Sequence, residues 1–207
     1  MRRAPVLELA LAVAGGRAGW AAEPLPKKLE GVTVEEHLGR RIDLAIPFVD
    51  QSGKRVFLRD LFGDGRPVLL TLNYYRCKML CNLQLNALTD ALRNLRWTPG
   101  REFRVVTVSI DHRETPPLAA GKRQAHLAVL GRGEVDWRFL TGTEASIRRL
   151  AHEVGFGFKY DKDIDQYAHP AVIQFLSPQG KLTRYIYGIE YQPRDLKFAL
   201  MEASDGK

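Results

Sequence analysis

The stretch RPVLLTLNYYRCKMLCNLQLNAL, Arg66–Leu88, joins a continuous apolar run to a mixed polar and apolar segment. The two cysteines of the chain, Cys77 and Cys81, lie at the junction. The apolar run, residues 66–75, is typical of a strand that is buried on both faces of a sheet. After the cysteines, apolar residues recur at helical spacing until Pro99 and Gly100 end the pattern. The stretch therefore predicts a central strand that leads directly into a helix, with both thiols at the carboxyl end of the strand.

The rest of the chain continues with alternating predicted strands and helices. Gln51-Ser52-Gly53 turns an alternating segment into a predicted β-hairpin. Further strands are predicted at 102–111 and 136–142 and as a strand pair over 171–188, and helices at 116–131, 143–156 and 192–204. Helices that alternate with buried strands predict an α/β fold, a sheet with helices on both faces, here preceded by an added N-terminal β-hairpin. A right-handed crossover would place Cys77 at the sheet edge where ligands bind in open α/β folds.

The N-terminal segment differs from the remainder. A basic start, an apolar run and small residues before Ala21 predict a secretory signal peptide over residues 1–21. The alternative is an uncleaved amphipathic tail, because the run is too short for a membrane span of ~20 residues. Residues 22–45 are expected to form a linker and arm, and residues 46–204 the folded domain. We therefore expect a periplasmic or secreted protein, associated with a membrane only through a partner or an uncleaved N-terminus.

Composition narrows the classes of partner. The 207 residues suit one domain plus a tail, and the formal net charge is +7. Lys and Arg are spread along the chain, without a basic block or a stripe in which basic and aromatic residues alternate. This charge distribution weakly favours acidic protein partners or anionic surfaces and argues against a nucleic-acid partner.

The cysteine pair admits several chemistries. A thiol at a helix start lies near the positive end of the helix dipole, which favours the thiolate by ~0.3–1 kcal/mol. Cys81 follows Cys77 by about one turn, so the sulfurs could form a disulfide or share a metal. A disulfide here would close a very short loop and add roughly 2 kcal/mol, which suits a reversible bond better than a structural one. Inert buried thiols are the other alternative. Two thiolates suit Cu(I) or Zn(II).

A third ligand would most simply be a histidine. The chain has five: His37, His112, His126, His152 and His169. His126 and His152 fall in predicted helices and are expected to be surface or partly packed residues, and His37 lies in the arm. His112 follows the second buried strand, at the same sheet edge as Cys77. His169 precedes a later strand, in an irregular acidic loop.

Three segments carry a family resemblance. YYRCKMLCNLQLNAL, VSIDHRETP and AHPAVIQFLSPQGKLTRYIYGIEYQPRDLKFALMEAS resemble the Sco/SenC family of copper-binding, thioredoxin-like proteins, over about Phe48 to Ser204. The resemblance implies a thioredoxin-like fold with an added hairpin. It also implies copper ligation by Cys77, Cys81 and His169. Asp111 matches the acidic residue that ends the second strand, as a structural residue or a support for a ligand.

The family also implies a function and partners. Its members serve assembly of the dinuclear copper centre of cytochrome c oxidase, as copper carriers, thiol–disulfide reductants or both. The implied partner is the copper-centre subunit of the oxidase, and another copper carrier or thiol–disulfide protein is a further one. Two positions depart from the family pattern. Lys78 replaces a frequent proline, and Ala168 replaces a carboxylate that could accept a hydrogen bond from the imidazole of His169.

Two other functions stay open beside a copper metallochaperone. One is a thiol–disulfide oxidoreductase that reduces partner cysteines without carrying metal, and the other is a structural zinc domain. His169 favours copper, because dithiol exchange needs no histidine. Met79 could add a thioether ligand or pack in the core. The segment before Pro170 also resembles the thioredoxin pattern in which a cis-proline faces the cysteines, which predicts a cis His169–Pro170 bond.

Overall fold

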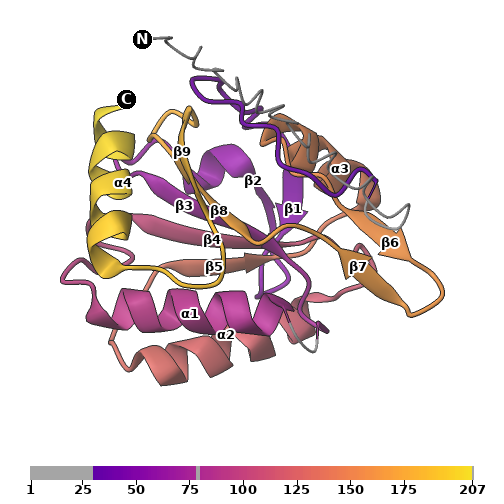
Figure 1. The fold of residues 1–207 in the computed structure, drawn as a ribbon. Coiled ribbons are helices and arrows are strands. Elements are labelled where there is room, and N and C mark those ends of the chain that lie inside the picture. The colour runs from indigo at the N-terminus through magenta and orange to yellow at the C-terminus, as the bar shows by residue number, and fades with distance from the viewer. Residues whose placement is uncertain (1–29, 78–79, 207) are drawn as a thin grey trace, which may run out of the picture.

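A five-stranded sheet forms the centre of the protein, as a computed structural model that describes residues 30–77 and 80–206 shows (Figure 1). Its strand order is β5-β4-β3-β8-β9. The strands are β3 (Val68–Asn73), β4 (Arg104–Ser109), β5 (Trp137–Leu140), β8 (Val172–Leu176) and β9 (Leu182–Tyr187). β3, β4 and β5 run parallel, whereas β8 pairs antiparallel with both β3 and β9. The predicted central strand is therefore the middle strand of the sheet.

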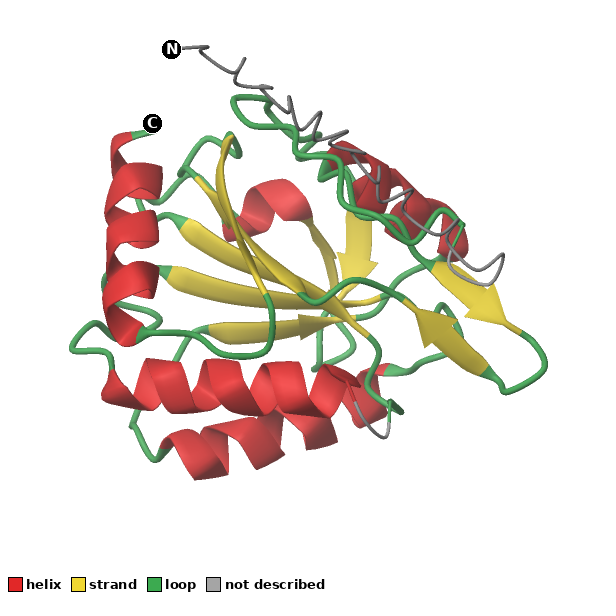
Figure 2. Cartoon of the chain, viewed as in Figure 1, coloured by secondary structure: helices red, strands yellow, loops and turns green. Residues whose placement is uncertain are grey.

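Helices cover both faces of this sheet, as predicted (Figure 2). One face packs against α1 (Leu80–Asn94), α2 (Pro116–Leu130) and α4 (Pro193–Asp205). The other face packs against α3 (Glu144–Glu153), a short 3-10 helix (Leu58–Leu61) and the hairpin of β1 (Pro47–Val49) and β2 (Arg55–Phe57). The α/β class and the added N-terminal hairpin are thus confirmed.

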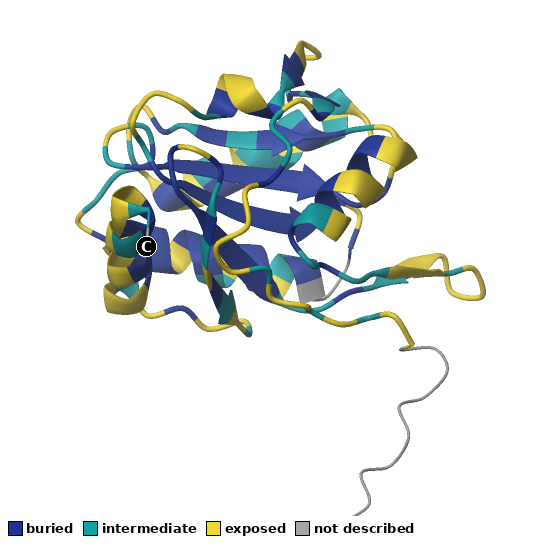
Figure 3. Cartoon of the chain, turned by 90° about the horizontal axis from the view of Figure 1, so that it is seen from above, coloured by how far each residue is buried: buried dark blue, intermediate teal, exposed yellow. Residues whose placement is uncertain are grey.

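Alternation along β3 explains why a continuous apolar run forms a strand. Leu70 and Leu72 belong to the core on the α3 side, and Leu69 belongs to the core on the α1 side. All six residues of β3 are buried, and the central strands are mostly dark blue in Figure 3. A strand enclosed by two layers needs apolar residues on both of its faces, so its sequence shows no polar alternation.

Local signals set the helix ends. The hydroxyl of Thr143 accepts a hydrogen bond from the Ser146 amide and caps α3. α2 begins at Pro116 and ends at Leu130, followed by Gly131, whose φ of 63° lies in the left-handed region that favours glycine. These boundaries leave short loops at both ends of the sheet, and the loop between β3 and α1 carries Cys77.

A second hairpin, β6 (Lys159–Asp161) with β7 (Gln166–Ala168), forms where the sequence suggested an irregular acidic loop. Tyr160 pairs with Tyr167 across it, and their ring centroids are 5.0 Å apart. Asp165 has a φ of 50°, which an aspartate in a tight turn tolerates. The residues of this hairpin are mostly charged and exposed, so its two strands lack the apolar alternation that usually identifies a strand. This hairpin leads directly into His169.

The arm before the domain packs along it in its described part, from residue 30 onward. The Glu35 amide donates to the Gly155 carbonyl at 2.9 Å, and the Gly39 amide donates to the Leu182 carbonyl at 2.8 Å. A Cβ at Gly155 would lie 1.7 Å from the Glu35 carbonyl oxygen, so this close approach requires glycine. The predicted signal peptide lies outside the described residues. No helix in the described ranges is long and apolar enough to cross a membrane.

Two expectations are corrected by the structure. The described peptide bonds, including His169–Pro170, are all trans, so the predicted cis bond is wrong. His126 is buried with 5% exposure and is not a surface residue of its helix. Its ring stacks on Phe139 with a centroid distance of 6.1 Å, and its Nδ1 lies 2.9 Å from the Thr89 hydroxyl. The space between α1, α2 and β5 thus accommodates a neutral imidazole.

Burial of His126 predicts a pH-dependent stability. Desolvation, aided by the positive charge of Lys122, lowers the pKa of His126 from 6.5 to about 4. Below pH 6.5 the unfolded chain binds a proton that the folded protein rejects. The contribution of His126 to the free energy of unfolding is therefore fully present above pH 6.5. It decreases by ~3 kcal/mol as the pH falls to about 4.

Urea unfolding of reduced protein at pH 7 and pH 4 measures this loss. The variant His126→Gln should lose about 3 kcal/mol less than the wild type over this interval. His152→Gln, which changes an exposed histidine, should behave as the wild type. Equal losses in the wild type and His126→Gln would exclude His126 as the source of the pH dependence.

Candidate functional site

Both thiols lie at the carboxyl end of the central strand. Cys77 is in the loop after β3, and Cys81 is in the first turn of α1. Neither forms a disulfide, and both side chains are buried. The Cys81 amide donates to the Cys77 Sγ over 3.4 Å. This contact uses one of the amides that a helix start leaves without an intrahelical partner, and it brings the first sulfur to the positive end of the helix.

His169 meets this pair from the other side. It lies between β7 and β8, and its Nε2 is 2.8 Å from the Cys81 Sγ although 88 residues separate the two. Its Nδ1 is 3.0 Å from the Pro170 carbonyl oxygen. Because a carbonyl only accepts, Nδ1 carries the proton and Nε2 turns its lone pair toward the sulfur. The Pro170 carbonyl therefore provides the acceptor that the missing carboxylate at Ala168 would have supplied.

Aromatic rings and burial set the protonation of the site. The His169 ring lies 6.1 Å from Tyr74 and 5.9 Å from Phe156, centroid to centroid. Desolvation raises the pKa of the Cys81 thiol, and the neighbouring Cys77 raises it further. Desolvation likewise lowers the pKa of His169, partly offset by its bond to Pro170. Both groups are thus held neutral, as a thiol donating to an imidazole nitrogen.

These contacts do not yet form a closed metal centre. Across residues 30–77 and 80–206, no three His, Cys, Asp or Glu side chains are arranged to hold a metal ion. The 2.8 Å between Cys81 Sγ and His169 Nε2 explains part of this, because it is too short for two ligands of one ion. Two ligands at ~2.0–2.3 Å from one ion would lie about 3.5 Å apart. An ion would replace the proton and separate the pair by less than ~1 Å.

The other histidines lie elsewhere or differ in setting. His37 of the arm lies beside His152 of α3, with 6.4 Å between their ring centroids. His126 is enclosed by Trp137 and Phe139 in the opposite core. His112 is exposed at the sheet edge. His169 is the histidine whose ring contacts a thiol in the described structure.

Asp111 supports the surroundings of the site. Burial alone would raise the pKa of its carboxyl, but hydrogen bonds from Arg113 outweigh this and lower it. Arg113 donates through Nε and Nη2 to Asp111, both at 2.8 Å, and through Nη1 to Asp165 at 2.9 Å. Asp165 lies in the turn between β6 and β7, so these ion pairs connect the end of β4 to the hairpin that leads to His169.

The Glu114 side chain fixes the loop that precedes Cys77, a role that the sequence did not predict. Its buried carboxylate accepts from the Tyr75 amide at 2.8 Å, the Arg76 amide at 2.7 Å and the Ser109 hydroxyl at 2.6 Å. Desolvation raises the pKa of Glu114 although these bonds oppose the shift. Glu114 belongs to the segment VSIDHRETP. An acidic residue about one turn after the end of a strand could have indicated this role.

A second unpredicted contact chain fixes the Cys77 carbonyl. The Asn82 Nδ2 donates to the Cys77 carbonyl oxygen at 2.8 Å, and the Lys122 ammonium donates to the Asn82 Oδ1. The cation determines which end of the amide faces Cys77, because an ammonium has no acceptor. Desolvation lowers the pKa of Lys122, partly offset by the attraction of the two cysteines. A half-buried positive charge from α2 thus lies beside the thiols.

Glu114→Gln is expected to loosen the loop ahead of Cys77. A glutamine side chain has one acceptor oxygen for the two backbone N–H groups of Tyr75 and Arg76. Its own NH₂ group would face the second N–H, and that hydrogen bond would be lost. We expect a loss of about 1–3 kcal/mol in the free energy of unfolding. Hydrogen exchange at the Tyr75 and Arg76 amides should accelerate. Glu190→Gln, at an exposed carboxylate, is the control and should leave both unchanged. Unchanged exchange in Glu114→Gln would show that the carboxylate does not hold this loop.

Comparisons with known proteins identify the family of the chain. A family model described as SCO1/SenC matches residues 36–202. The SCO1 protein homolog of Bacillus subtilis (strain 168) is 25% identical over 150 residues, which cover 72% of this chain and 75% of that protein. This chain therefore shares most of its length with the family pattern.

Solved structures show the same fold. The copper-bound ScoI of Arabidopsis thaliana has a TM-score of 0.63 and 19% identity, over 80% of this chain and 100% of that one. BsSco, described as a member of the Sco family of cytochrome c oxidase assembly proteins, has a TM-score of 0.64 and 23% identity, over 84% of this chain and 99% of that one. The predicted thioredoxin-like fold is thereby confirmed. Because the family model spans most of the described residues, the chain belongs to the SCO1/SenC family.

Proposed function

We propose that this protein is a copper metallochaperone that binds one copper ion through Cys77, Cys81 and His169. The observation that carries the proposal is the 2.8 Å contact between the Cys81 Sγ and the His169 Nε2, made across 88 residues. Two segments distant in the chain converge on one sulfur at the sheet edge where α/β folds bind ligands. A purely structural role would not require an imidazole whose lone pair is aimed at a thiol.

The donor set suits copper in both oxidation states. Thiolates are soft ligands that prefer Cu(I), and an imidazole nitrogen beside sulfur suits Cu(II). Zinc would also accept these donors, but a structural zinc site normally has four protein ligands. Binding must displace the Cys81 proton, whose pKa is raised by burial. Copper affinity should therefore increase with pH, and loading should release protons.

The proposed task is delivery of copper for assembly of the dinuclear copper centre of cytochrome c oxidase. Relatives support it, since the Arabidopsis ScoI has been solved with copper and BsSco is described as an oxidase assembly protein. The proposed partner is the oxidase subunit that carries the copper centre, with a copper carrier or thiol–disulfide protein upstream. Such work would take place outside the cytoplasm, in keeping with the signal-peptide pattern of residues 1–21.

Thiol–disulfide exchange is the second candidate. Two cysteines within one helical turn that form no disulfide favour it, with the Cys77 Sγ accepting a hydrogen bond from the Cys81 amide. Joining Cys77 to Cys81 would release two electrons and two protons, enough to reduce one disulfide of a partner. This activity needs no histidine, which makes His169 the residue that separates the two functions.

The experiment is His169→Ala in a strain whose oxidase assembly depends on this protein. If copper delivery is the function, little copper centre should assemble although the cysteines still cycle between dithiol and disulfide. His112→Ala, at an exposed histidine, is the control and should assemble normally. Normal assembly with His169→Ala at wild-type abundance would instead establish the oxidoreductase.

A further inference from the structure

A large hollow lies at the end of the sheet opposite the thiols. Its volume is about 860 Å³. It is formed where the chain enters the parallel strands: by Arg66 before β3, the loop before β4, and the loop between α2 and β5. Its two acidic residues are Glu134 and Asp136, and its five arginines are Arg66, Arg101, Arg123, Arg132 and Arg138. The lining therefore holds more positive than negative charge.

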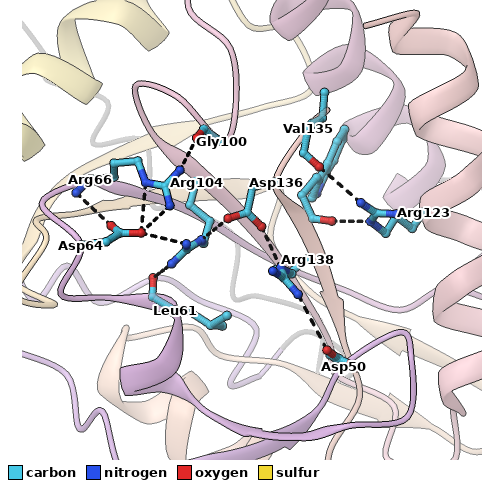
Figure 4. Close-up of polar contacts among 11 residues, drawn as sticks. Asp50, Leu61, Asp64, Arg66, Gly100, Arg104, Arg123, Val135, Asp136 and Arg138 are labelled. Carbon is cyan, nitrogen blue, oxygen red and sulfur yellow. Dashed lines mark hydrogen bonds and ion pairs between the residues drawn. The ribbon is translucent and has the colours of Figure 1, made fainter. Parts of the chain in front are cut away.

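Some of these charges are balanced locally, as Figure 4 shows. Arg66 pairs with Asp64, and the buried Arg104 behind it donates to Asp64 at 2.9 Å and to Asp136 at 2.6 Å. Arg138 donates to the other oxygen of Asp136 at 2.7 Å. The Asp136 carboxylate is thus shared by two guanidinium groups and cannot neutralise a third.

Other arginines of the lining have neutral partners. The Arg123 Nε donates to the Trp137 carbonyl at 2.7 Å, and its Nη2 donates to the Val135 carbonyl at 3.3 Å. Arg132 donates to the carbonyls of Trp97, at 2.8 Å, and Arg93, at 2.9 Å, near the end of α1. Carbonyl oxygens occupy these donors but do not cancel the charges.

The charges that act on Arg123 are, on balance, repulsive. Desolvation lowers the pKa of this guanidinium, and repulsion by Arg138 lowers it further, against a weaker attraction by Asp136. Arg101 is exposed at the same hollow. Within residues 30–77 and 80–206, neither Arg101 nor Arg123 has a carboxylate at ion-pair distance. A bound anion would relieve both charges.

We propose that this hollow, lined by Arg101, Arg123 and Arg138, binds a phosphate-bearing anion. Guanidinium groups present paired N–H donors that match phosphate oxygens, and two of these three lack a carboxylate partner in the described structure. Ligand pockets usually occupy ~300–1,000 Å³, so the hollow has room for more than a single phosphate group. The ligand is a small phosphorylated molecule or the headgroup of an anionic phospholipid.

The site is independent of the proposed copper function. The thiols follow the carboxyl end of β3, whereas Arg66 and the loops of the hollow precede the parallel strands. A six-residue strand spans about 20 Å. Loss of anion binding should therefore leave copper binding unchanged, and failure of either proposal can be recognised separately.

Calorimetric titration with inorganic pyrophosphate, and sedimentation with vesicles, test the proposal. The vesicles contain phosphatidylcholine alone or with an added anionic phospholipid. The double variant Arg101→Gln/Arg123→Gln should weaken binding at least tenfold. Arg55→Gln/Arg194→Gln removes the same charge at exposed positions outside the hollow and should change binding less than twofold. Arg101→Gln alone provides the test if loss of the Arg123 bonds impairs folding, with an expected loss of about threefold.

The two probes distinguish the source of the phosphate. Saturable one-to-one binding of pyrophosphate that depends on Arg101 and Arg123 supports a free phosphorylated ligand. Binding to anionic vesicles alone, with the same dependence, supports a lipid headgroup. No saturable binding of either probe at millimolar concentration would overturn the proposal, and so would equal weakening in both double variants.

Discussion

Replacing Cys81 by serine is expected to abolish tight copper binding, with a loss of affinity of at least about a thousandfold. Residues that merely support metal ligands already contribute 10–100-fold, and a hydroxyl is a poor ligand for a soft ion. The fold should survive, because the serine hydroxyl can donate to the His169 Nε2 in place of the thiol that contacts it at 2.8 Å. Competition with a Cu(I) chelator under reducing conditions measures the loss.

The matched variants make this test specific. Cys77→Ser should lose copper to a similar extent, because both sulfurs are needed by the proposed site. Thr89→Ser, a conservative change at a buried position of the same helix, should bind copper as the wild type. Retention of tight Cu(I) binding by folded Cys81→Ser protein would contradict ligation by this thiol.

Replacing His169 by alanine is expected to separate the two oxidation states of copper. Affinity for Cu(II) should fall by more than about a hundredfold, because the imidazole nitrogen is lost, whereas Cu(I) should remain bound by two thiolates within about tenfold. The Nδ1 contact with the Pro170 carbonyl, which orients the ring, disappears with it. Absorption and electron paramagnetic resonance spectra of Cu(II)-loaded protein, and chelator competition for Cu(I), measure the two affinities.

His112→Ala is the control for this experiment, since it removes an exposed histidine from the same sheet edge. Its Cu(II) spectrum should match that of the wild type. A Cu(II) spectrum that is unchanged in His169→Ala and altered in His112→Ala would assign the imidazole ligand to the other histidine and reject the proposed site.

The position of the thiols could be predicted because it depends on local patterns. A buried strand, a short loop and a helix follow one another within the stretch that contains Cys77 and Cys81, and each has its own signal. The approach of His169 depends on the pairing of β8 with β3, which no local pattern contains. The family resemblance supplied that long-range information as an expectation.

The supporting residues were harder to foresee. Glu114, Asn82 and Lys122 act through side-chain contacts between separate elements, and in sequence they are ordinary polar residues of a loop and two helices. His126 was misplaced because the charged Lys122 and Arg123 precede it in α2, while tertiary packing against Phe139 decides its burial. The β6–β7 hairpin was missed because its paired tyrosines are its main apolar signal.

X-ray absorption at the copper edge, on protein loaded with one equivalent of copper, tests the central proposal most directly. We predict two sulfur neighbours at about 2.3 Å and one imidazole nitrogen at about 2.0 Å in the Cu(II) form. The nitrogen should be missing from His169→Ala, and one sulfur should be missing from Cys81→Ser. Copper bound by oxygen and nitrogen alone, or a wild-type spectrum in both variants, would contradict a site built from Cys77, Cys81 and His169.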